Sequence, residues 1–191
     1  MGNINVTRLR TAKMENEEWA RFMAVGAELE DAPIYINDTS AITALELRAQ
    51  ARRLKATENI GMVLVDYLQL MVDSKARSRE QEVANISKSL KALAKELRLP
   101  VVALSQLNRK VEERTNKRPQ LADLRDSGSL EQDADLILFI YRDKVYREDS
   151  PDKGVAEINV AKQRMGPTGM FKLTFQPDYS RFRDFFDEKL I

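Results

Sequence analysis

The chain has 191 residues, 43% of them hydrophobic, which is the size of one ordinary globular domain with a substantial core. Its 31 basic and 30 acidic residues nearly balance, so no global positive field indicates binding to nucleic acid or membranes. The sequence has no cysteine and no histidine, which excludes disulfides, thiolate nucleophiles, Cys/His zinc sites and imidazole acid–base chemistry. Any chemistry must therefore use carboxylates, amides, hydroxyls, lysine or arginine.

Targeting signals are absent from the sequence as given. The first twenty residues lack the apolar segment of a signal peptide. The longest apolar stretch, residues 60–72, is interrupted by Asp66 and Gln69 and is too short to cross a bilayer. We therefore expect a soluble, cytoplasmic protein with no membrane partner.

Residues 1–57 form a mainly helical portion in this prediction. Apolar residues recur at helical spacing over residues 16–29, and a short strand is expected at residues 34–36. Thr43 and Glu46 have the spacing of a capping box, which predicts a second helix running to about Lys55.

Residues 58–191 form the sheet portion. Residues 61–65, 101–104 and 136–140 are apolar without alternation, as in strands covered on both faces of a parallel sheet. A long helix is expected before Pro100, because helical spacing puts five apolar residues on one face. They are Val83, Ile86, Leu90, Leu93 and Leu97. Residues 155–161 and 170–175 alternate and predict an antiparallel hairpin. The order indicates an α/β fold, mainly parallel with an antiparallel C-terminal hairpin.

Two polar positions follow predicted strands. Asp66 comes at the carboxyl end of the first buried strand, the edge at which open α/β sheets bind ligands, and a carboxylate there suits Mg²⁺. Gln106 follows the next strand, where a neutral amide can bind a γ-phosphate or orient water. The plainer interpretations are an aspartate that caps a loop and a solvated strand end.

The strand predicted at residues 155–161 is followed by two cations, Lys162 and Arg164, and then by a Gly- and Pro-containing turn at residues 165–169. Alternation puts both side chains on one side, where they could stabilise phosphoryl charge, in the manner of an arginine finger, for a neighbouring subunit. The plainer interpretation is a solvated basic hairpin tip.

Two loops are candidates for contact with a nucleic-acid backbone. The loop at residues 123–129 contains Gly128, which lets main-chain N–H groups approach a phosphate. A second stretch is basic but diluted by Glu112 and Glu113, and an exposed mobile loop explains it better. Its cations are Arg109, Lys110, Arg114, Lys117 and Arg118.

Six segments of the chain carry a resemblance when they are taken together and in their order. They are Val63-Leu-Val-Asp-Tyr-Leu-Gln-Leu70, Leu90-Lys-Ala-Leu-Ala-Lys-Glu-Leu97, Ala103-Leu-Ser-Gln-Leu-Asn-Arg109, Asp123-Leu-Arg-Asp-Ser-Gly128, Glu131-Gln-Asp-Ala-Asp135 and Lys162-Gln-Arg164. Together they resemble the motor domain of the DnaB family of bacterial replicative DNA helicases, from about Arg8 to Phe182. The resemblance implies a RecA-like P-loop NTPase fold, with residues 1–191 as a partial motor domain.

The resemblance also implies roles for the polar residues. Asp66 resembles the Walker B aspartate that holds Mg²⁺ through water, and Gln106 resembles the glutamine that senses the γ-phosphate of ATP. Lys162 and Arg164 resemble the pair that reaches the nucleotide of an adjacent subunit. The implied activity is ATP-dependent unwinding of DNA at the replication fork, as part of the primosome.

The implied DNA-binding residues are Arg125, Asp126 and Gly128, in a loop that lines the central channel of a homo-hexameric ring. Single-stranded DNA, primase and a helicase loader are the implied partners, with ATP and Mg²⁺ as cofactors. The sequence has Asp126 where the family usually has glutamate, and Met165 where a polar residue commonly follows the arginine.

One family motif is not found. None of the seven glycines begins a G-x-x-x-x-G-K-[ST] motif, so the phosphate-binding P-loop is absent from the sequence. In the family this loop and the catalytic glutamate precede the matched region, so no general base is assigned. We expect a fragment that lacks the N-terminal part of the motor domain, exposes apolar sheet edge and is inactive alone. A separate chain that carries the P-loop is a further candidate partner.

Three other interpretations remain open. A non-catalytic, helicase-like module could bind DNA or contact a helicase ring without turning over ATP. A carboxylate-metal nuclease would need Asp66, Asp133 and Asp135 to converge. A recombinase ATPase of the same fold fits the Asp66 and Lys162 segments less well.

Overall fold

The computed structural model describes residues 2–186, except for the side chains of residues 125–128. The chain divides into two compact units. The first contains residues 1–35, 140–159 and 169–191, and the second contains residues 36–139 and 160–168. None of the described helices is both long enough and apolar enough to cross a bilayer.

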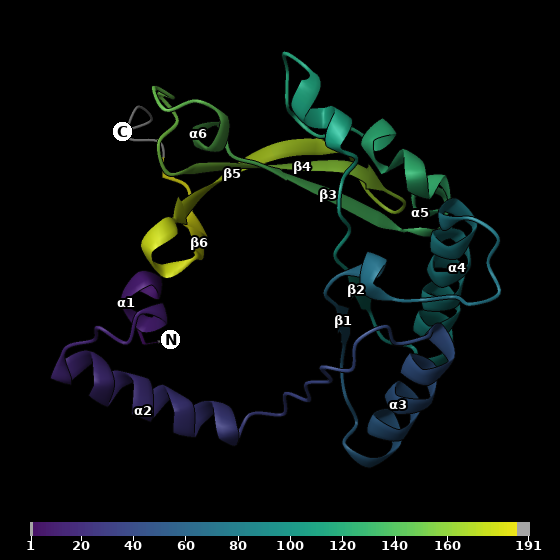
Figure 1. Ribbon diagram of the computed structural model, residues 1–191, viewed down its shortest axis with the longest axis horizontal. Helices are drawn as coiled ribbons and strands as arrows, with labels where there is room; N and C mark the ends of the chain where they lie inside the picture. The colour runs from purple at the N-terminus through teal and green to yellow at the C-terminus, as the bar shows by residue number, and fades with distance from the viewer. Residues whose placement is uncertain (1, 187–191) are drawn as a thin grey trace. The chain divides into compact units, whose positions relative to one another are not determined.

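The second unit is built on two parallel strands and two helices. Strands β1 (Val63–Val65) and β2 (Val101–Ala103) pair in parallel. The connection between them contains helix α4 (Arg79–Leu97), as a parallel pair requires. Helix α3 (Ala44–Thr57) lies beside α4 (Figure 1). Both helices confirm the sequence predictions.

Local signals fix the ends of these helices. Thr43 and Glu46 form the predicted capping box at the start of α3, in which the Glu46 backbone N–H donates to Thr43 Oγ1 at 3.2 Å. Helix α4 begins after Ser78, whose hydroxyl accepts from the Gln81 N–H at 3.2 Å. It ends at Arg98, which has the left-handed conformation common at helix ends, with φ of 51°.

The main hydrophobic core lies between these helices and one face of the β1–β2 pair. The predicted apolar face of α4 supplies much of it, and Val63 and Val65 supply the strand side. The buried members are Ala51, Val63, Val65, Leu68, Met71, Val83, Ile86, Leu90, Leu93 and Leu99.

The prediction that the parallel strands are covered on both faces is wrong for this chain. In β1 the side chain of Leu64 is 62% exposed between two buried valines. The strand β3 (Leu136–Tyr141) likewise alternates buried and exposed residues. The exposed apolar residues in or next to the second unit's strands are Met62, Leu64, Val102, Leu104, Leu136 and Leu138, and we call them the open sheet face. Among the described residues no element covers it. The sequence predicted an exposed apolar sheet edge, whereas the exposed apolar residues found here belong to a face of the strands.

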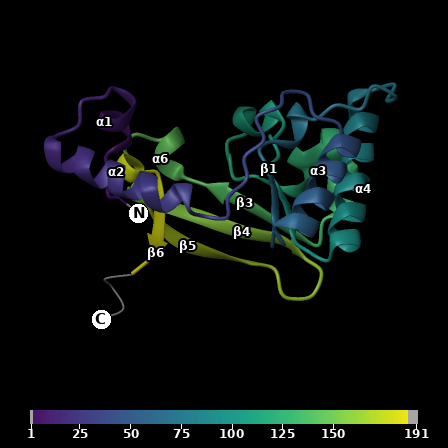
Figure 2. The same ribbon diagram turned by 90° about the horizontal axis from the view of Figure 1, so that it is seen from below.

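A second sheet has the strand order β3, β4 (Val155–Gln163), β5 (Gly169–Gln176) and β6 (Arg181–Asp184). Residues 164–168 alone join β4 to β5, and so short a connection requires antiparallel strands, which confirms the predicted hairpin (Figure 2). Strand β6 was not predicted and pairs antiparallel with β5. In the part of the chain described, β2 and β3 are not paired, so the expected single sheet is present as two.

Short helices complete the second unit. They are the 3-10 helices η1 (Leu68–Leu70), η2 (Arg109–Glu113) and η3 (Leu121–Ser127) and the helix α5 (Gly128–Asp133). Leu124 of η3 packs with Ile137 and Phe139 of β3 in a second, smaller core.

The first unit holds helices α1 (Val6–Arg10), α2 (Asn16–Glu30) and α6 (Asp143–Tyr146) and the 3-10 helix η4 (Pro177–Tyr179). The Arg181 guanidinium donates to Asn3 Oδ1 at 2.8 Å and so ties the two ends of the unit together. The rings of Phe175 and Phe182 pack with their centroids 5.0 Å apart.

The strand expected at residues 34–36 is not formed. These residues have no assigned secondary structure, and Ile36 is 88% exposed. An apolar triplet becomes a strand only when a neighbouring strand accepts its backbone hydrogen bonds, and residues 2–186 supply none here.

Candidate nucleotide site and DNA loop

Asp66 follows β1 directly, and its side chain is exposed. Backbone hydrogen bonds on both sides fix this strand end: the Leu104 N–H donates to the Val65 carbonyl at 2.9 Å, and the Leu68 N–H donates to the Leu104 carbonyl at 2.9 Å. The fully buried Leu68 then anchors η1 in the core. The carboxylate therefore stands at the carboxyl end of a parallel strand, where such sheets bind ligands.

Gln106 lies just beyond the end of β2, the parallel neighbour of β1. Because β1 and β2 pair in parallel, Asp66 and Gln106 both follow strands that end at one edge of the sheet. The side chain of Gln106 is exposed. Its amide has no hydrogen bond to any part of the chain that the structure describes, so it is available to a ligand.

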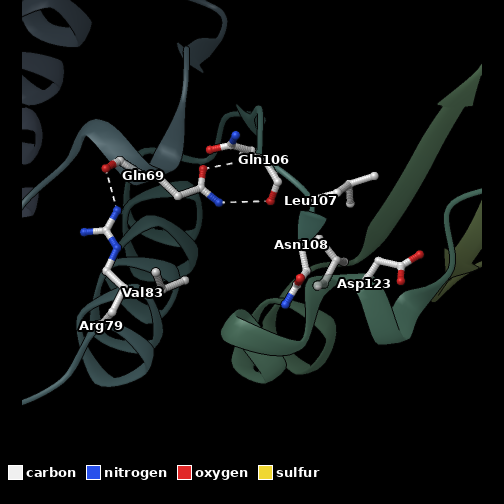
Figure 3. A pocket seen from close by; sticks show the side chains of 8 residues that line it. Gln69, Arg79, Val83, Gln106, Leu107, Asn108 and Asp123 are labelled. Atoms are coloured by element: carbon white, nitrogen blue, oxygen red, sulfur yellow. Dashed lines mark hydrogen bonds between the residues drawn. The ribbon is translucent and has the colours of Figure 1, made fainter. Parts of the chain in front are cut away.

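A small pocket opens beside these strand ends (Figure 3). Its volume is about 130 Å³, below the roughly 300–1,000 Å³ of ordinary ligand pockets, so these residues alone do not enclose a nucleotide. The lining residues are Gln69, Arg79, Val83, Gln106, Leu107, Asn108, Asp123 and Leu124.

The donor set at Asp66 fits Mg²⁺ held through water. Among the side chains that the structure describes, no three acidic ones gather in a way that could hold a metal ion. Mg²⁺ bound with a nucleotide usually takes one or two carboxylates, phosphate oxygens and several waters, so a single exposed carboxylate suffices. Asp133 and Asp135, which a nuclease site would need, bind Ser87 and Lys91 instead.

Lys162 and Arg164 both contact the end of α5. The Arg164 guanidinium donates to the Gln132 carbonyl at 3.1 Å, and the Lys162 ammonium donates to the carbonyls of Glu131 and Gln132. The two side chains therefore lie on the same side of the chain, as predicted. Cations at a helix C-terminus satisfy carbonyls that lack a partner within the helix.

Asp135 links Arg164 to helix α4. Its carboxylate pairs with the Lys91 ammonium and lies 3.4 Å from Arg164 Nη1. The hydrogen bond from Lys91 lowers the pKa of the Asp135 carboxyl below its ordinary value, and the charges of Arg164 and Lys162 add to this. The Arg164 side chain remains about half exposed, with a side-chain exposure of 52%.

The predicted DNA loop is more helical than expected. Residues 123–127 belong to η3 and Gly128 begins α5, because Leu124 and Leu130 anchor these turns in the smaller core. The side chains of Arg125 and Asp126, and the surroundings of Gly128, lie outside what the structure describes.

The anchor of this loop is Asp123, whose buried carboxylate pairs with Arg114 at 2.7 Å. Arg114 also donates to the Arg118 carbonyl at 2.9 Å. This cation of the second basic stretch therefore holds the loop in place, and it points toward the protein rather than outward.

Sequence reasoning missed two groups of contacts. Gln69 hydrogen-bonds to the strand end that carries Gln106, and Lys91 pairs with Asp135. Gln69 lies three residues after Asp66, and this nearness was the only signal that could have drawn attention to it.

Comparison with known proteins gives the family. The family described as DnaB-like helicase C terminal domain matches residues 1–184. The replicative DNA helicase DnaB of Buchnera aphidicola is 52% identical over 99% of this chain. That of Geobacillus stearothermophilus is 50% identical over 95%. The chain spans 42% and 40% of these two relatives, respectively.

Solved structures agree. One solved ATPase domain superposes with a TM-score of 0.90 at 39% identity, over 96% of this chain and 66% of that one. A DnaB-like replicative helicase, solved in a study of its interactions with primase, superposes with a TM-score of 0.89 at 40% identity, over 95% of this chain and 46% of that one. Both the RecA-like fold and the resemblance seen in the sequence are confirmed: the chain belongs to the DnaB-like helicase C-terminal domain family.

Proposed function

We propose that this chain is the C-terminal part of the ATP-driven motor of a replicative DNA helicase, which translocates on single-stranded DNA and unwinds duplex at the fork. The observation that carries the proposal is the pairing of β1 with β2, which brings Asp66 and Gln106 to one edge of a parallel sheet. Family membership over residues 1–184 supports it.

The proposed chemistry uses Mg²⁺–ATP, in which the metal neutralises charge on the phosphates. Asp66 holds a water of the metal, and Gln106 contacts the γ-phosphate. Lys162 and Arg164 reach the nucleotide of the neighbouring subunit in a homo-hexameric ring. The support for this last role is geometric. The Arg164 guanidinium has five N–H donors, of which one binds the Gln132 carbonyl and one faces the Asp135 carboxylate at 3.4 Å. The other three are left for phosphate oxygens.

Residues 1–191 belong to one partial motor domain in this proposal. The chain covers 66% of the solved ATPase domain described above, so residues without a counterpart here are available to cover the open sheet face and to supply the phosphate-binding loop. Burial of apolar side chains such as Leu64 and Leu138 would drive that association. Single-stranded DNA, primase and a loader are the proposed partners.

The experiment is DNA unwinding by a chimera in which this chain replaces the matched part of Geobacillus stearothermophilus DnaB; we call it the completed chimera. We expect ATP-dependent unwinding of a forked duplex. A ring that binds DNA without hydrolysing ATP would instead identify a non-catalytic binding module. Strand exchange without unwinding would identify a recombinase.

Arg125 is proposed to bind the DNA backbone together with Asp126 and Gly128. Arg125→Ala in the completed chimera should weaken binding to single-stranded oligonucleotides about equally whatever their sequence, and should reduce the slope of log K against log salt by about 0.7. Fluorescence anisotropy over a salt series measures this. Lys110→Ala, an exposed cation of the second basic stretch, is the control. A larger loss for Lys110→Ala would move the DNA contact to that stretch.

A further inference from the structure

The side chain of Gln69 binds the strand end that carries Gln106 through three hydrogen bonds. Figure 3 shows the two that it makes with Gln106. Gln69 Oε1 accepts from the Gln106 backbone N–H at 3.1 Å. Gln69 Nε2 donates to the Gln106 carbonyl at 3.2 Å and to Ser105 Oγ at 3.0 Å. The amide thus satisfies the N–H and the carbonyl of the same residue at once, because its oxygen accepts and its NH2 group donates.

The contact between Gln69 and Gln106 extends the hydrogen bonding between β1 and β2 beyond the last backbone pair. The last backbone bonds of the ladder join Leu104 to Val65 and to Leu68, at 2.9 Å each. Beyond them the chain turns into η1, so no backbone group of β1 faces Gln106. The Gln69 amide takes the place of the missing peptide group and extends the pairing by side chain.

Gln69 is itself held from the other side. Arg79, in the first turn of α4, donates from Nη2 to the Gln69 carbonyl at 2.5 Å. Arg79 also pairs with Glu82, and Glu82 Oε1 accepts from the Asp73 N–H at 2.8 Å. The segment after Asp66 is therefore fixed to the start of α4 and to the end of β2 together.

Within Gln106, Gln69 binds only backbone groups and leaves the side-chain amide exposed. From this geometry we infer that Gln69 is a positioning residue for Gln106: it fixes the backbone from which the γ-phosphate-sensing amide projects, and it links that amide to the Asp66 segment. We call the three hydrogen bonds of the Gln69 side chain to Ser105 and Gln106 the clamp. The clamp rests on the structure alone, and the role of Gln106 rests on the proposed function.

The clamp is tested first in the full chain by hydrogen exchange of the Gln106 backbone N–H, read by NMR. Gln69→Ala removes the acceptor and should speed exchange about 5-fold to 10-fold. Gln69→Glu keeps the acceptor and the side-chain length but loses the donor to the Gln106 carbonyl, so exchange of the Gln106 N–H should lie between that of the parent and that of Gln69→Ala. Gln81→Ala is the control, since Gln81 also accepts from a backbone N–H, that of Arg77 at 3.1 Å. Unchanged exchange at Gln106 in Gln69→Ala would overturn the clamp.

The second test uses the completed chimera. Gln69→Ala should lower kcat for ATP about 10-fold to 100-fold with KM nearly unchanged, because a misplaced catalytic group costs rate rather than binding. In a Gln106→Ala background the same change should have little further effect. A merely structural role would give additive losses in the two backgrounds.

The outcomes separate this inference from the proposed function. An active wild-type chimera in which Gln69→Ala behaves like Gln81→Ala would overturn the positioning role alone. An inactive wild-type chimera would contradict the proposed function and, with it, the catalytic part of the inference.

Discussion

Arg164→Ala in the completed chimera is expected to lower ATP turnover by ~10³ or more while leaving nucleotide binding largely intact. The reason is that charge on the transferring phosphoryl group develops in the transition state, where a guanidinium binds it more strongly than in the ground state. Arg164 is suited to this role because it is about half exposed and its guanidinium is steadied at the Gln132 carbonyl. Steady-state turnover and binding of a fluorescent nucleotide measure the two effects separately.

The control for this variant is Arg183→Ala, which removes an exposed arginine from β6. Its turnover should be close to that of the parent. Because Arg164 is proposed to act on a neighbour, mixed rings of parent and Arg164→Ala subunits should also lose activity. Near-normal turnover of Arg164→Ala rings would remove the arginine-finger assignment.

Leu93→Ala should have the largest effect on stability, lowering the free energy of unfolding of this chain by ~2–5 kcal/mol. Leu93 lies on the buried face of α4, is 1% exposed and packs in the core that supports β1 and β2. Truncation leaves a cavity that the neighbouring side chains fill only in part. Urea unfolding followed by circular dichroism measures the change as a lower midpoint with a similar slope.

Leu45→Ala is the matched control, since this leucine of α3 is 75% exposed. It should change the free energy of unfolding by no more than about 0.5 kcal/mol. Equal losses in the two variants would contradict the described core.

The helices could be predicted because their signals are local. The capping box of Thr43 and Glu46 and the apolar spacing along α4 depend only on neighbouring residues, and the structure has both. The hairpin of β4 and β5 followed from alternation and a short turn. Such features need no knowledge of the rest of the sheet.

The burial of the strands could not be predicted in this way. An unbroken apolar run such as residues 61–65 is typical of a strand with a layer on each face, but only one layer is present among the described residues. Such a run shows that the side chains are suited to burial. It does not show which residues bury the second face of the strand. The same reasoning applies to residues 34–36, which are apolar but have no assigned secondary structure.

Part of the candidate site was predictable and part was not. Asp66 and Gln106 could each be placed after a predicted strand, and the parallel pairing of β1 with β2 in the structure brings both to one edge of the sheet. The contact of Gln69 with Gln106 depends on the turn of η1, which carries a side chain back across to β2, and no sequence pattern specifies that path. The roles of Arg125, Asp126 and Gly128 remain predictions from family resemblance.

The most direct test of the central claim is ATP hydrolysis by this purified chain, with and without single-stranded DNA, before and after adding the P-loop segment of a DnaB relative. A motor fragment predicts no turnover alone and DNA-stimulated turnover after complementation. Turnover by the chain alone would contradict our assignment of the nucleotide site, and inactivity of a stably assembled complex would contradict the motor function.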